Sequence, residues 1–286
     1  MKFDELNLSS ELLRTIQKIG LTIPTEIQEK SIPSVLKGND VIGESATGSG
    51  KTLVFGCGIL ENVTPNKGLQ ALVLVPTREL AEQVKESLNE LSQNKKLKVI
   101  AVYGGVSINP QMTALKRSEI VVATPGRLFD HMNQRTIDLS KIKILVLDEA
   151  DRMLDMGFIR DVEKIIQRCP KERQTMFFSA TISSEIQRLS NKYMNNPIRV
   201  SAKKLVDSSK LKQVYYNAAR GLKLPLLVNL LRNEKTGLVM VFCNMRVTTD
   251  FVVKNLRLNK VDAMAIHGGL TQNKRTNMMS LFNHGK

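Results

Sequence analysis

The sequence lacks tryptophan and has only three cysteines, three histidines and 5% aromatic residues in its 286 positions. Cys57, Cys169 and Cys243 lie far apart, without the paired spacing of a disulfide framework or a zinc site. No apolar run reaches the roughly 18 residues that a membrane-spanning helix needs. The first ten residues, MKFDELNLSS, lack the basic-then-apolar profile of a signal peptide. These absences predict a cytoplasmic protein that does not insert into a membrane.

Acidic residues are scarce relative to basic ones. The sequence has 27 Asp and Glu against 42 Lys and Arg, a formal net charge of +15, and residues 207–286 are the most basic part. A surplus of this size favours an anionic partner, such as a nucleic acid or an acidic membrane surface. The hydrophobic content of 42% is sufficient for a packed core, so we expect a folded protein with an anionic ligand.

The sequence contains a series of short apolar runs rich in Val, Ile and Leu, separated by segments of helical period such as residues 77–91. Runs of this kind are typical of strands that are buried on both faces. They predict strands at 41–43, 71–75, 99–102, 120–123, 144–147 and 176–178. The alternation of strand and helix predicts an α/β fold, with a parallel sheet flanked by helices and ligands beyond the carboxyl ends of the strands.

A polar, basic stretch without clear period, AKKLVDSSKLK at 202–212, is interpreted as a linker. It divides the chain into a first domain, residues 1–206, and a second domain, residues 207–286. In the second domain we predict strands at 213–217, 238–243 and 263–266, and helices near 221–232, 247–257 and 271–282. So few strands leave a sheet edge open. We expect a shortened version of a longer protein; the alternatives are a protein partner or a swapped copy that covers the edge.

Residues 45–52, SATGSGKT, follow a predicted strand and precede an apolar helix, which is the context of a phosphate-binding loop. Glycines let backbone N–H groups turn inward, and the next helix presents its positive end to phosphate. The predicted phosphate contacts are Ser45, Ala46, Thr47, Gly48, Ser49, Gly50 and Lys51, and Thr52 would hold Mg²⁺. Ser45 stands where the general pattern begins with glycine, and its small side chain is sterically acceptable. The alternative is a flexible Gly/Ser turn.

A second buried strand ends at Asp148, and Glu149 follows at once. Beside a phosphate-binding loop, Asp148 is placed to hold the metal through its water shell, and Glu149 to polarise an attacking water. The alternative is a pair of acidic residues at a helix N-terminus, where they are common. The loop upstream favours the catalytic interpretation.

Residues 148–151 spell DEAD, and together with the phosphate-binding loop they resemble the signature of the DEAD-box ATP-dependent RNA helicases. Further motifs of that family occur in order: IGLTIPTEIQ at 19–28, PTREL at 76–80, GG at 104–105, TPGR at 124–127, SAT at 179–181, LVMVFCN at 238–244 and IHGGLTQNKR at 266–275. The resemblance implies a RecA-like P-loop domain followed by the start of a second RecA-like domain. It also implies ATP hydrolysis and local unwinding of RNA duplexes.

The resemblance also implies roles for individual residues. Phe3 and Gln28 would contact the adenine, although Leu21 stands where the family usually has Phe and Ala46 where it often has Gln. Lys51, Asp148 and Glu149 would be catalytic, and Asp151 with Ser179 and Thr181 would couple nucleotide state to domain closure. Single-stranded RNA or a short duplex would be gripped by its backbone, independently of sequence, by Thr77, Arg78, Gly105, Thr124, Gly126, Arg127 and Arg275.

After residue 286 the family continues with a motif that bears arginine fingers, so the resemblance implies that this chain alone turns over ATP weakly. Two other functions stay open. One is an ATP-binding and RNA-binding clamp or regulatory fragment that does not unwind. The other is a DNA-directed motor, against which the PTREL, TPGR and SAT motifs argue. His131, His267 and His284 are isolated in the sequence and receive no metal or catalytic role.

Overall fold

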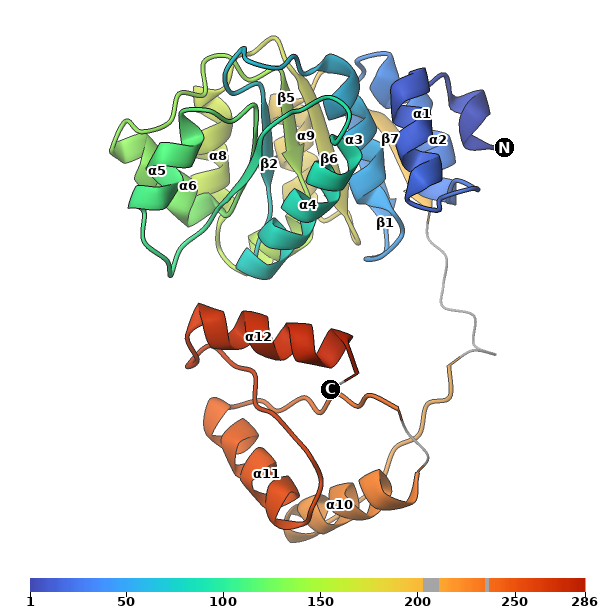
Figure 1. Cartoon of the computed structure of the whole chain (residues 1–286), viewed down its shortest axis with the longest axis vertical. Helices are drawn as coiled ribbons and strands as arrows, with labels where there is room; N and C mark the ends of the chain where they lie inside the picture. The colour runs from blue at the N-terminus through green and yellow to red at the C-terminus, as the bar shows by residue number, and fades with distance from the viewer. Residues whose placement is uncertain (203–210, 235–236, 286) are drawn as a thin grey trace. The chain divides into compact units, whose positions relative to one another are not determined.

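The computed structural model describes residues 1–202, 211–234 and 237–285 (Figure 1). The chain divides into two compact units, Met1–Val206 and Asp207–Lys286. None of the helices in the described ranges is long and apolar enough to cross a membrane. Most of the linker predicted at 202–212 lies outside the described residues.

The first unit is built on a seven-stranded parallel sheet with the strand order β3-β4-β2-β5-β6-β1-β7. This confirms the predicted α/β fold with a parallel sheet. The strands are β1 (Val41–Ser45), β2 (Ala71–Leu74), β3 (Val99–Val102), β4 (Ile120–Ala123), β5 (Ile144–Leu147), β6 (Gln174–Ser179) and β7 (Ile198–Ala202). Leu74 lies opposite both Ala123 and Leu147, so β2, β4 and β5 end level with one another at the carboxyl edge.

Strand β7 has no counterpart among the predicted strands. Its sequence, IRVSA, has no continuous apolar run, and only Val200 and Ala202 of its five residues are buried. Strand β7 lies at an edge of the sheet, pairs with β1 alone among the described residues, and has largely exposed side chains. The other edge strand, β3, keeps an apolar sequence, so it is the exposure of β7 rather than its edge position that goes with the missing hydrophobic signal.

Helices cover both faces of the sheet (Figure 1). They are η1 (Phe3–Leu6), α1 (Ser10–Lys18), α2 (Glu26–Leu36), α3 (Lys51–Asn62), α4 (Arg78–Leu91), α5 (Asn109–Leu115), α6 (Pro125–Asn133), α7 (Ala150–Asp155), α8 (Ile159–Arg168) and α9 (Ser184–Tyr193). Alternate strand residues serve the two faces. Val73 and Val146 join the core beneath η1 and α1 to α4, whereas Leu72 and Leu145 join the core beneath α6 to α9.

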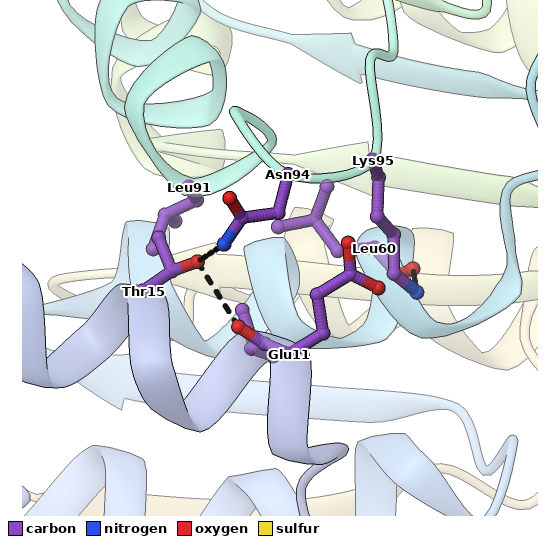
Figure 2. A pocket seen from close by; sticks show the side chains of 7 residues that line it. Glu11, Thr15, Leu60, Leu91, Asn94 and Lys95 are labelled. Atoms are coloured by element: carbon purple, nitrogen blue, oxygen red, sulfur yellow. Dashed lines mark hydrogen bonds between the residues drawn. The ribbon is translucent and has the colours of Figure 1, made fainter.

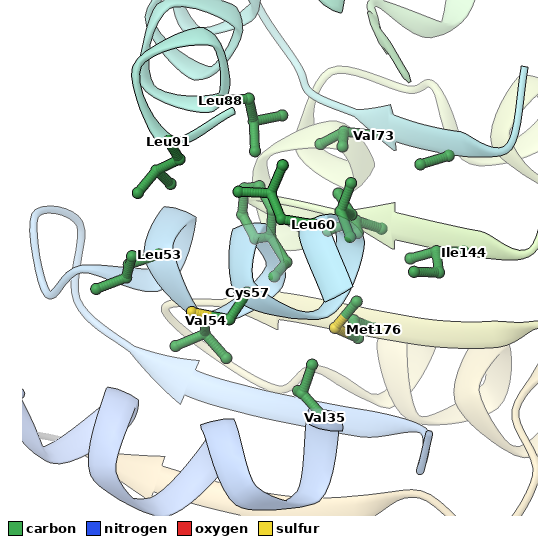
Figure 3. Close-up of a cluster of buried hydrophobic side chains, with 14 of the residues drawn as sticks. Val35, Leu53, Val54, Cys57, Leu60, Val73, Leu88, Leu91, Ile144 and Met176 are labelled. Carbon is green, nitrogen blue, oxygen red and sulfur yellow. The ribbon is translucent and has the colours of Figure 1, made fainter. Parts of the chain in front are cut away.

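Helix α3, which follows the predicted phosphate-binding loop, is buried on almost every side (Figure 3). Phe55 packs against Phe178 of β6 with ring centroids 5.7 Å apart. Gly58 allows α2 to approach closely, because a Cβ at this position would overlap the side chain of Val35. A helix fixed in this way gives the loop before it a rigid base.

The amino-terminal edge of the sheet is closed by buried polar side chains. Asp40 accepts hydrogen bonds from the N–H groups of Thr175 at 2.6 Å and Asn195 at 2.7 Å. Gln174 donates from Nε2 to the carbonyl oxygens of Val35 and Asn39, both at 2.8 Å. The carboxylate of Asp40 and the amide of Gln174 are thus satisfied internally, whereas Thr175 Oγ1 and Arg173 Nε at the same edge have no partner within the described residues.

Helix α1 docks against the ends of α3 and α4 around a small pocket (Figure 2). Thr15 accepts a hydrogen bond from Asn94 Nδ2 at 2.9 Å and donates to the carbonyl of Glu11 at 3.1 Å. Lys95 donates to the carbonyl of Leu60. These contacts attach the amino-terminal segment to the domain.

The described part of the second unit contains η3 (Arg220–Leu222), α10 (Lys223–Asn233), α11 (Arg246–Leu258) and α12 (Gln272–Asn283). The three predicted helices are confirmed. The strands predicted at 213–217, 238–243 and 263–266 are wrong, since no residue of these segments forms a strand. A strand needs a hydrogen-bonded neighbour. These segments are instead exposed, with Tyr215 and Phe242 each at 92%.

Candidate functional site

The strand order sorts the sequence motifs into two groups along the carboxyl edge of the first unit. The central strand β5, then β6 and β1, lead into the DEAD sequence, the SAT sequence and the phosphate-binding loop. On the other side β2, β4 and β3 lead into PTREL, TPGR and GG. Residues predicted to handle nucleotide are therefore neighbours, and so are those predicted to bind RNA.

The loop between β1 and α3 has the features of a phosphate cradle. Gly48 and Gly50 have φ angles of 78° and 91°, a region that other residues rarely adopt. Within the described residues, the N–H groups of Thr47, Gly48 and Gly50 donate to no protein acceptor. Ser45 Oγ lies 2.9 Å from Ser49 Oγ, so the serine at the first position of the loop ties its two ends together.

Lys51 is the first residue of α3 and is 6% exposed. Its Nζ donates to the carbonyl of Ser45 at 3.2 Å, and no carboxylate of the described residues forms an ion pair with it. An ammonium group has three N–H donors and is unfavourable to bury, and the nearby charge of Asp148 offsets part of this cost from beyond ion-pair distance. The loop therefore combines a buried positive charge with unpaired N–H groups, as an anion requires.

The start of α2 is attached to this loop. Gln28, 4% exposed, accepts from the N–H of Thr25 at 2.9 Å and donates from Nε2 to the carbonyl of Gly50 at 3.0 Å. Thr25 Oγ1 donates to the carbonyl of Ser49 at 2.7 Å. Each amide atom of Gln28 keeps one further hydrogen-bonding position. Thr25 was missed by the sequence interpretation, although its T-x-x-Q spacing is a helix-capping signature.

Phe3, predicted to contact the nucleotide, is 3% exposed and packs in the hydrophobic core with Leu6 and Leu8. In this structure the ring of Phe3 contributes to packing. A contact between Phe3 and the nucleotide stays a prediction. Ile23, which precedes α2, is 74% exposed.

Asp148 and Glu149 are both buried at the end of β5. Burial raises the pKa of Asp148 to about 6; the positive charge of Lys51 opposes this rise, and the charge of Glu149 adds to it. Asp148 Oδ1 accepts a hydrogen bond from the N–H of Glu149 at 3.0 Å. The carboxylate of Asp148 is thus oriented by the backbone that follows it.

Glu149 has a φ of 52°, in the left-handed region that a residue with a side chain rarely enters. Its carboxylate accepts from Thr47 Oγ1 of the phosphate-binding loop at 3.5 Å and pairs with Arg152 at 3.3 Å. Backbone strain of this kind is concentrated at functional sites. Arg152 is a further residue that the sequence interpretation did not include.

Asp151, Ser179 and Thr181 form a connected group between β5 and β6. Asp151 Oδ2 accepts from the N–H of Thr181 at 3.0 Å and from its hydroxyl at 3.2 Å, and the N–H of Asp151 donates to Ser179 Oγ at 3.2 Å. Burial tends to raise the pKa of Asp151, but these hydrogen bonds outweigh it and hold the pKa below its ordinary value.

On the other half of the edge, loop 104–106 lies over the guanidinium of Arg78. Gly105 has a φ of 81°, and a Cβ there would overlap that guanidinium. Arg127 donates to the carbonyl of Val106 from both NH1 and NH2 at 3.0 Å. In the described structure the N–H groups of Gly104 and Gly105 have no protein acceptor.

The remaining predicted RNA contacts mark the starts of helices. Thr77 caps α4 by accepting from the N–H of Leu80 at 3.3 Å. Thr124 precedes α6, and Gly126 has open space around its Cα. Arg275 lies in the second unit, where NH1 donates to Gln272 Oε1 at 3.2 Å.

Comparison with known proteins agrees with this arrangement. The sequence model of the DEAD/DEAH box helicases matches residues 25–189, and that of the helicase conserved C-terminal domain matches residues 222–286. The chain belongs to the DEAD/DEAH box helicase family.

Relatives within the family are similar over the whole chain. The ATP-dependent RNA helicase CshA of Limosilactobacillus reuteri is 45% identical over 100% of the chain, and CshA of Bacillus subtilis is 42% identical over 99%. The chain spans 58% of the length of each of these two relatives. A crystal structure of a DEAD box protein from Methanococcus jannaschii matches with a TM-score of 0.70 at 41% identity, covering 99% of this chain and 77% of that one.

The likeness to this DEAD-box structure confirms a RecA-like fold. Of the sequence-based site residues, those of the phosphate-binding loop, the DEAD sequence and the SAT sequence lie at the carboxyl ends of neighbouring strands. Phe3 belongs to the hydrophobic core cluster that also contains Leu53 and Val54 of α3. Gln28 lies in α2 and contacts the phosphate-binding loop. Its separation from the loop in the sequence does not indicate this contact.

Proposed function

We propose that the chain is the ATP-binding and RNA-binding part of an ATP-dependent RNA helicase, which hydrolyses ATP with Mg²⁺ and separates short RNA duplexes locally. The observation that supports this most strongly is the buried Lys51, which forms no ion pair within the described residues, beside a loop whose N–H groups at Thr47, Gly48 and Gly50 have no acceptor there and near the buried pair Asp148 and Glu149. The names of the relatives, ATP-dependent RNA helicases, agree with it.

The residues present fit a nucleoside triphosphate with a divalent metal. The N–H groups of residues 47–50 and the ammonium of Lys51 would hold the phosphates. Magnesium usually takes only one or two protein ligands together with phosphate oxygens, and Thr52 and Asp148 would supply them. When bound, the ion would neutralise charge that develops on the phosphate oxygens.

Glu149 is the residue proposed to orient the attacking water. Its carboxylate is positioned by Thr47 on one side and Arg152 on the other, so its direction is set before any ligand arrives. Asp151 holds the loop that follows β6 through Thr181, and β6 lies between β5 and β1. A change around the phosphates would therefore be transmitted directly to the SAT sequence.

Gln28 is proposed to read the adenine edge with the donor and the acceptor that its present hydrogen bonds leave over. Because the same amide binds the carbonyl of Gly50, base recognition would be linked to the shape of the phosphate-binding loop.

RNA is proposed to bind across the loops that follow β2, β3 and β4. Exposed N–H groups at Gly104 and Gly105, the guanidinium of Arg78 and the start of α6 can contact phosphates without reading bases. The net charge of +15 favours such a partner. A preference for RNA over DNA would come from contacts to 2′-hydroxyl groups. A cytoplasmic location, and a protein partner or second copy at the second unit, stay predictions.

The test is a phosphate-release assay on the chain with ATP and Mg²⁺, in the presence of single-stranded RNA, single-stranded DNA or neither. We expect stimulation by RNA only, abolished in Glu149→Gln, which should still bind ATP, and in Lys51→Ala, which should not. RNA binding without stimulation would favour the clamp. Equal stimulation by DNA, or full ATP affinity in Lys51→Ala, would contradict the proposal.

A further inference from the structure

A buried polar network lies behind loop 104–106 and contains, besides Arg127, side chains that the site described above does not include. It joins Gln111 of α5 to His131 and Arg127 of α6 and to Thr136. Gln111 is 8% exposed and His131 is fully buried. Two buried polar side chains carry a desolvation cost that an apolar pair would not, so their hydrogen bonds call for an explanation.

The orientation of the Gln111 amide is fixed by its neighbours. Nε2 donates to the carbonyl of Tyr103 at 3.0 Å, and Oε1 accepts from NH1 of Arg127 at 3.4 Å. His131 Nε2 lies 3.1 Å from the same Oε1, which can only accept. His131 must therefore carry a proton on Nε2 and donate it to Gln111.

The other side of the imidazole ring is also held. Nδ1 of His131 lies 2.7 Å from Thr136 Oγ1. Burial lowers the pKa of His131, and the charge of Arg127 lowers it further while Asp130 opposes the change. In the neutral ring with Nε2–H, Nδ1 accepts from the Thr136 hydroxyl, whose one proton also lies within reach of the carbonyl of His131, with Oγ1 and that oxygen 3.1 Å apart. Thr136 thus holds both the ring and the backbone of His131.

This network holds the loop from Tyr103 to Val106 at both ends. Gln111 binds the carbonyl of Tyr103, and Arg127, which contacts Gln111, binds the carbonyl of Val106 twice. The hydroxyl of Tyr103 also donates to Glu82 of α4 at 2.7 Å. Between the two fixed ends lie Gly104 and Gly105, whose N–H groups have no acceptor within the described part of the chain.

We propose that Gln111 and His131 are positioning residues for RNA binding, which set the loop and Arg127 so that the N–H groups of Gly104 and Gly105 face a backbone phosphate. The inference rests on the proposed RNA binding and extends it to two buried residues that do not touch RNA themselves. Preorganised donors bind an anion more tightly than donors that must first be ordered.

Gln111→Met is the first test, because methionine has a similar volume and makes none of the three hydrogen bonds. The matched control is Gln174→Met, since Gln174 is also 8% exposed and also binds backbone carbonyls, but at the opposite edge of the sheet. Affinity for an unstructured single-stranded RNA is measured by fluorescence anisotropy, with Mg²⁺ and a non-hydrolysable ATP analogue.

We expect Gln111→Met to weaken RNA binding about tenfold, and Gln174→Met by less than about twofold. The slope of log affinity against log salt should fall in magnitude by about one in Gln111→Met alone, as when one phosphate contact is lost. The affinity for the ATP analogue should be unchanged in both variants. A general loss of stability would not separate the two ligands in this way.

A second pair of variants keeps the test independent of the folding of Gln111→Met. In His131→Gln the side-chain amide can still donate to Gln111, whereas in His131→Asn the shorter amide reaches only Thr136. We expect near wild-type RNA affinity in His131→Gln and a loss of about tenfold in His131→Asn.

Two outcomes would overturn the inference. Wild-type RNA affinity and salt slope in Gln111→Met, or equal affinities in the two His131 variants, would show that the network does not position the loop. If instead the wild-type chain with ATP analogue and Mg²⁺ binds no RNA at all, the proposed function itself is contradicted, and the inference with it.

Discussion

Gln28 Nε2 donates to the carbonyl of Gly50 at 3.0 Å, one residue before Lys51. Through this bond the start of α2 is attached to the phosphate-binding loop, and Thr25 adds a second bond to Ser49. The residue proposed to read the base therefore also shapes the cradle for the phosphates.

We expect Gln28→Ala to weaken ATP binding about tenfold and to remove the preference for ATP over GTP, because the amide would be lost from both the base and the loop. Displacement of a fluorescent nucleotide by ATP and by GTP measures both effects. Thr25→Val is the control, since it removes the bond to Ser49 and the hydroxyl of the helix cap but keeps the Gln28 amide, and it should weaken ATP and GTP equally. An unchanged ATP-to-GTP ratio in Gln28→Ala would contradict base reading by this residue.

Asp148→Asn should stabilise the metal-free protein at pH 8. Burial raises the pKa of Asp148 from 3.8 to about 6, so the folded state binds the proton more tightly than the unfolded state. The stability from this proton is complete below pH 3.8 and is lost as the pH rises through about 6. At pH 8 the asparagine variant, which carries no buried charge, should gain on the order of 1–3 kcal/mol.

Urea unfolding of the wild type and Asp148→Asn at pH 5 and pH 8, with EDTA, measures this difference. The gain should be larger at pH 8, and Mg²⁺-dependent ATP turnover should be lost. A variant that is less stable than the wild type at pH 8 would show that the buried charge of Asp148 does not destabilise the folded protein.

Replacing Glu149 should reverse the usual order of alanine and glycine. Alanine stabilises a helix interior relative to glycine by up to about 1 kcal/mol, but Glu149 is the N-cap of α7, where glycine is the better of the two. Because φ is 52° at this position, a Cβ is unfavourable there by roughly 1–2 kcal/mol. We therefore expect Glu149→Gly to melt at a higher temperature than Glu149→Ala, with both variants inactive in phosphate release. Equal melting temperatures would argue against a strained backbone at Glu149.

Gly105→Ala and Gly126→Ala should separate a conformational requirement from a contact requirement. Alanine at 105 meets a positive φ and the guanidinium of Arg78, so both stability and RNA affinity should fall. At 126 there is open space, so stability should be retained. If RNA nevertheless binds more weakly to Gly126→Ala, the backbone of Gly126 lies against the RNA. Thermal melting and anisotropy measure the two effects, and a destabilised Gly126→Ala would contradict this reading.

Much of the fold and of the site could be predicted where the sequence carries a local signal. Strands β3, β4 and β5 are apolar throughout; Asp148 and Glu149 lie directly after β5, and Lys51 follows β1 at the end of a glycine-containing loop. Strand β7 gave no signal, because its sequence mixes polar residues with apolar ones and most of its side chains are exposed.

The errors and omissions have physical causes. Apolar segments of the second unit form no strand, because apolar composition alone does not provide a hydrogen-bonded neighbour. The burial of Phe3 and the network of Gln111 and His131 depend on contacts between distant segments. The positive φ of Glu149 follows from the turn after β5, and the residue type alone does not predict it.

The sheet places β2 directly beside β5, and the N–H of Asp148 donates to the carbonyl of Leu74 at 2.9 Å. Adjacent strands lie less than about 5 Å apart. The strand that leads into PTREL and the strand that leads into DEAD are therefore joined directly by main-chain hydrogen bonds. Within this unit the proposed phosphate site and the proposed RNA site are therefore connected without a long relay. A displacement of Asp148 would act directly on β2, the strand that leads to Arg78 at the start of α4.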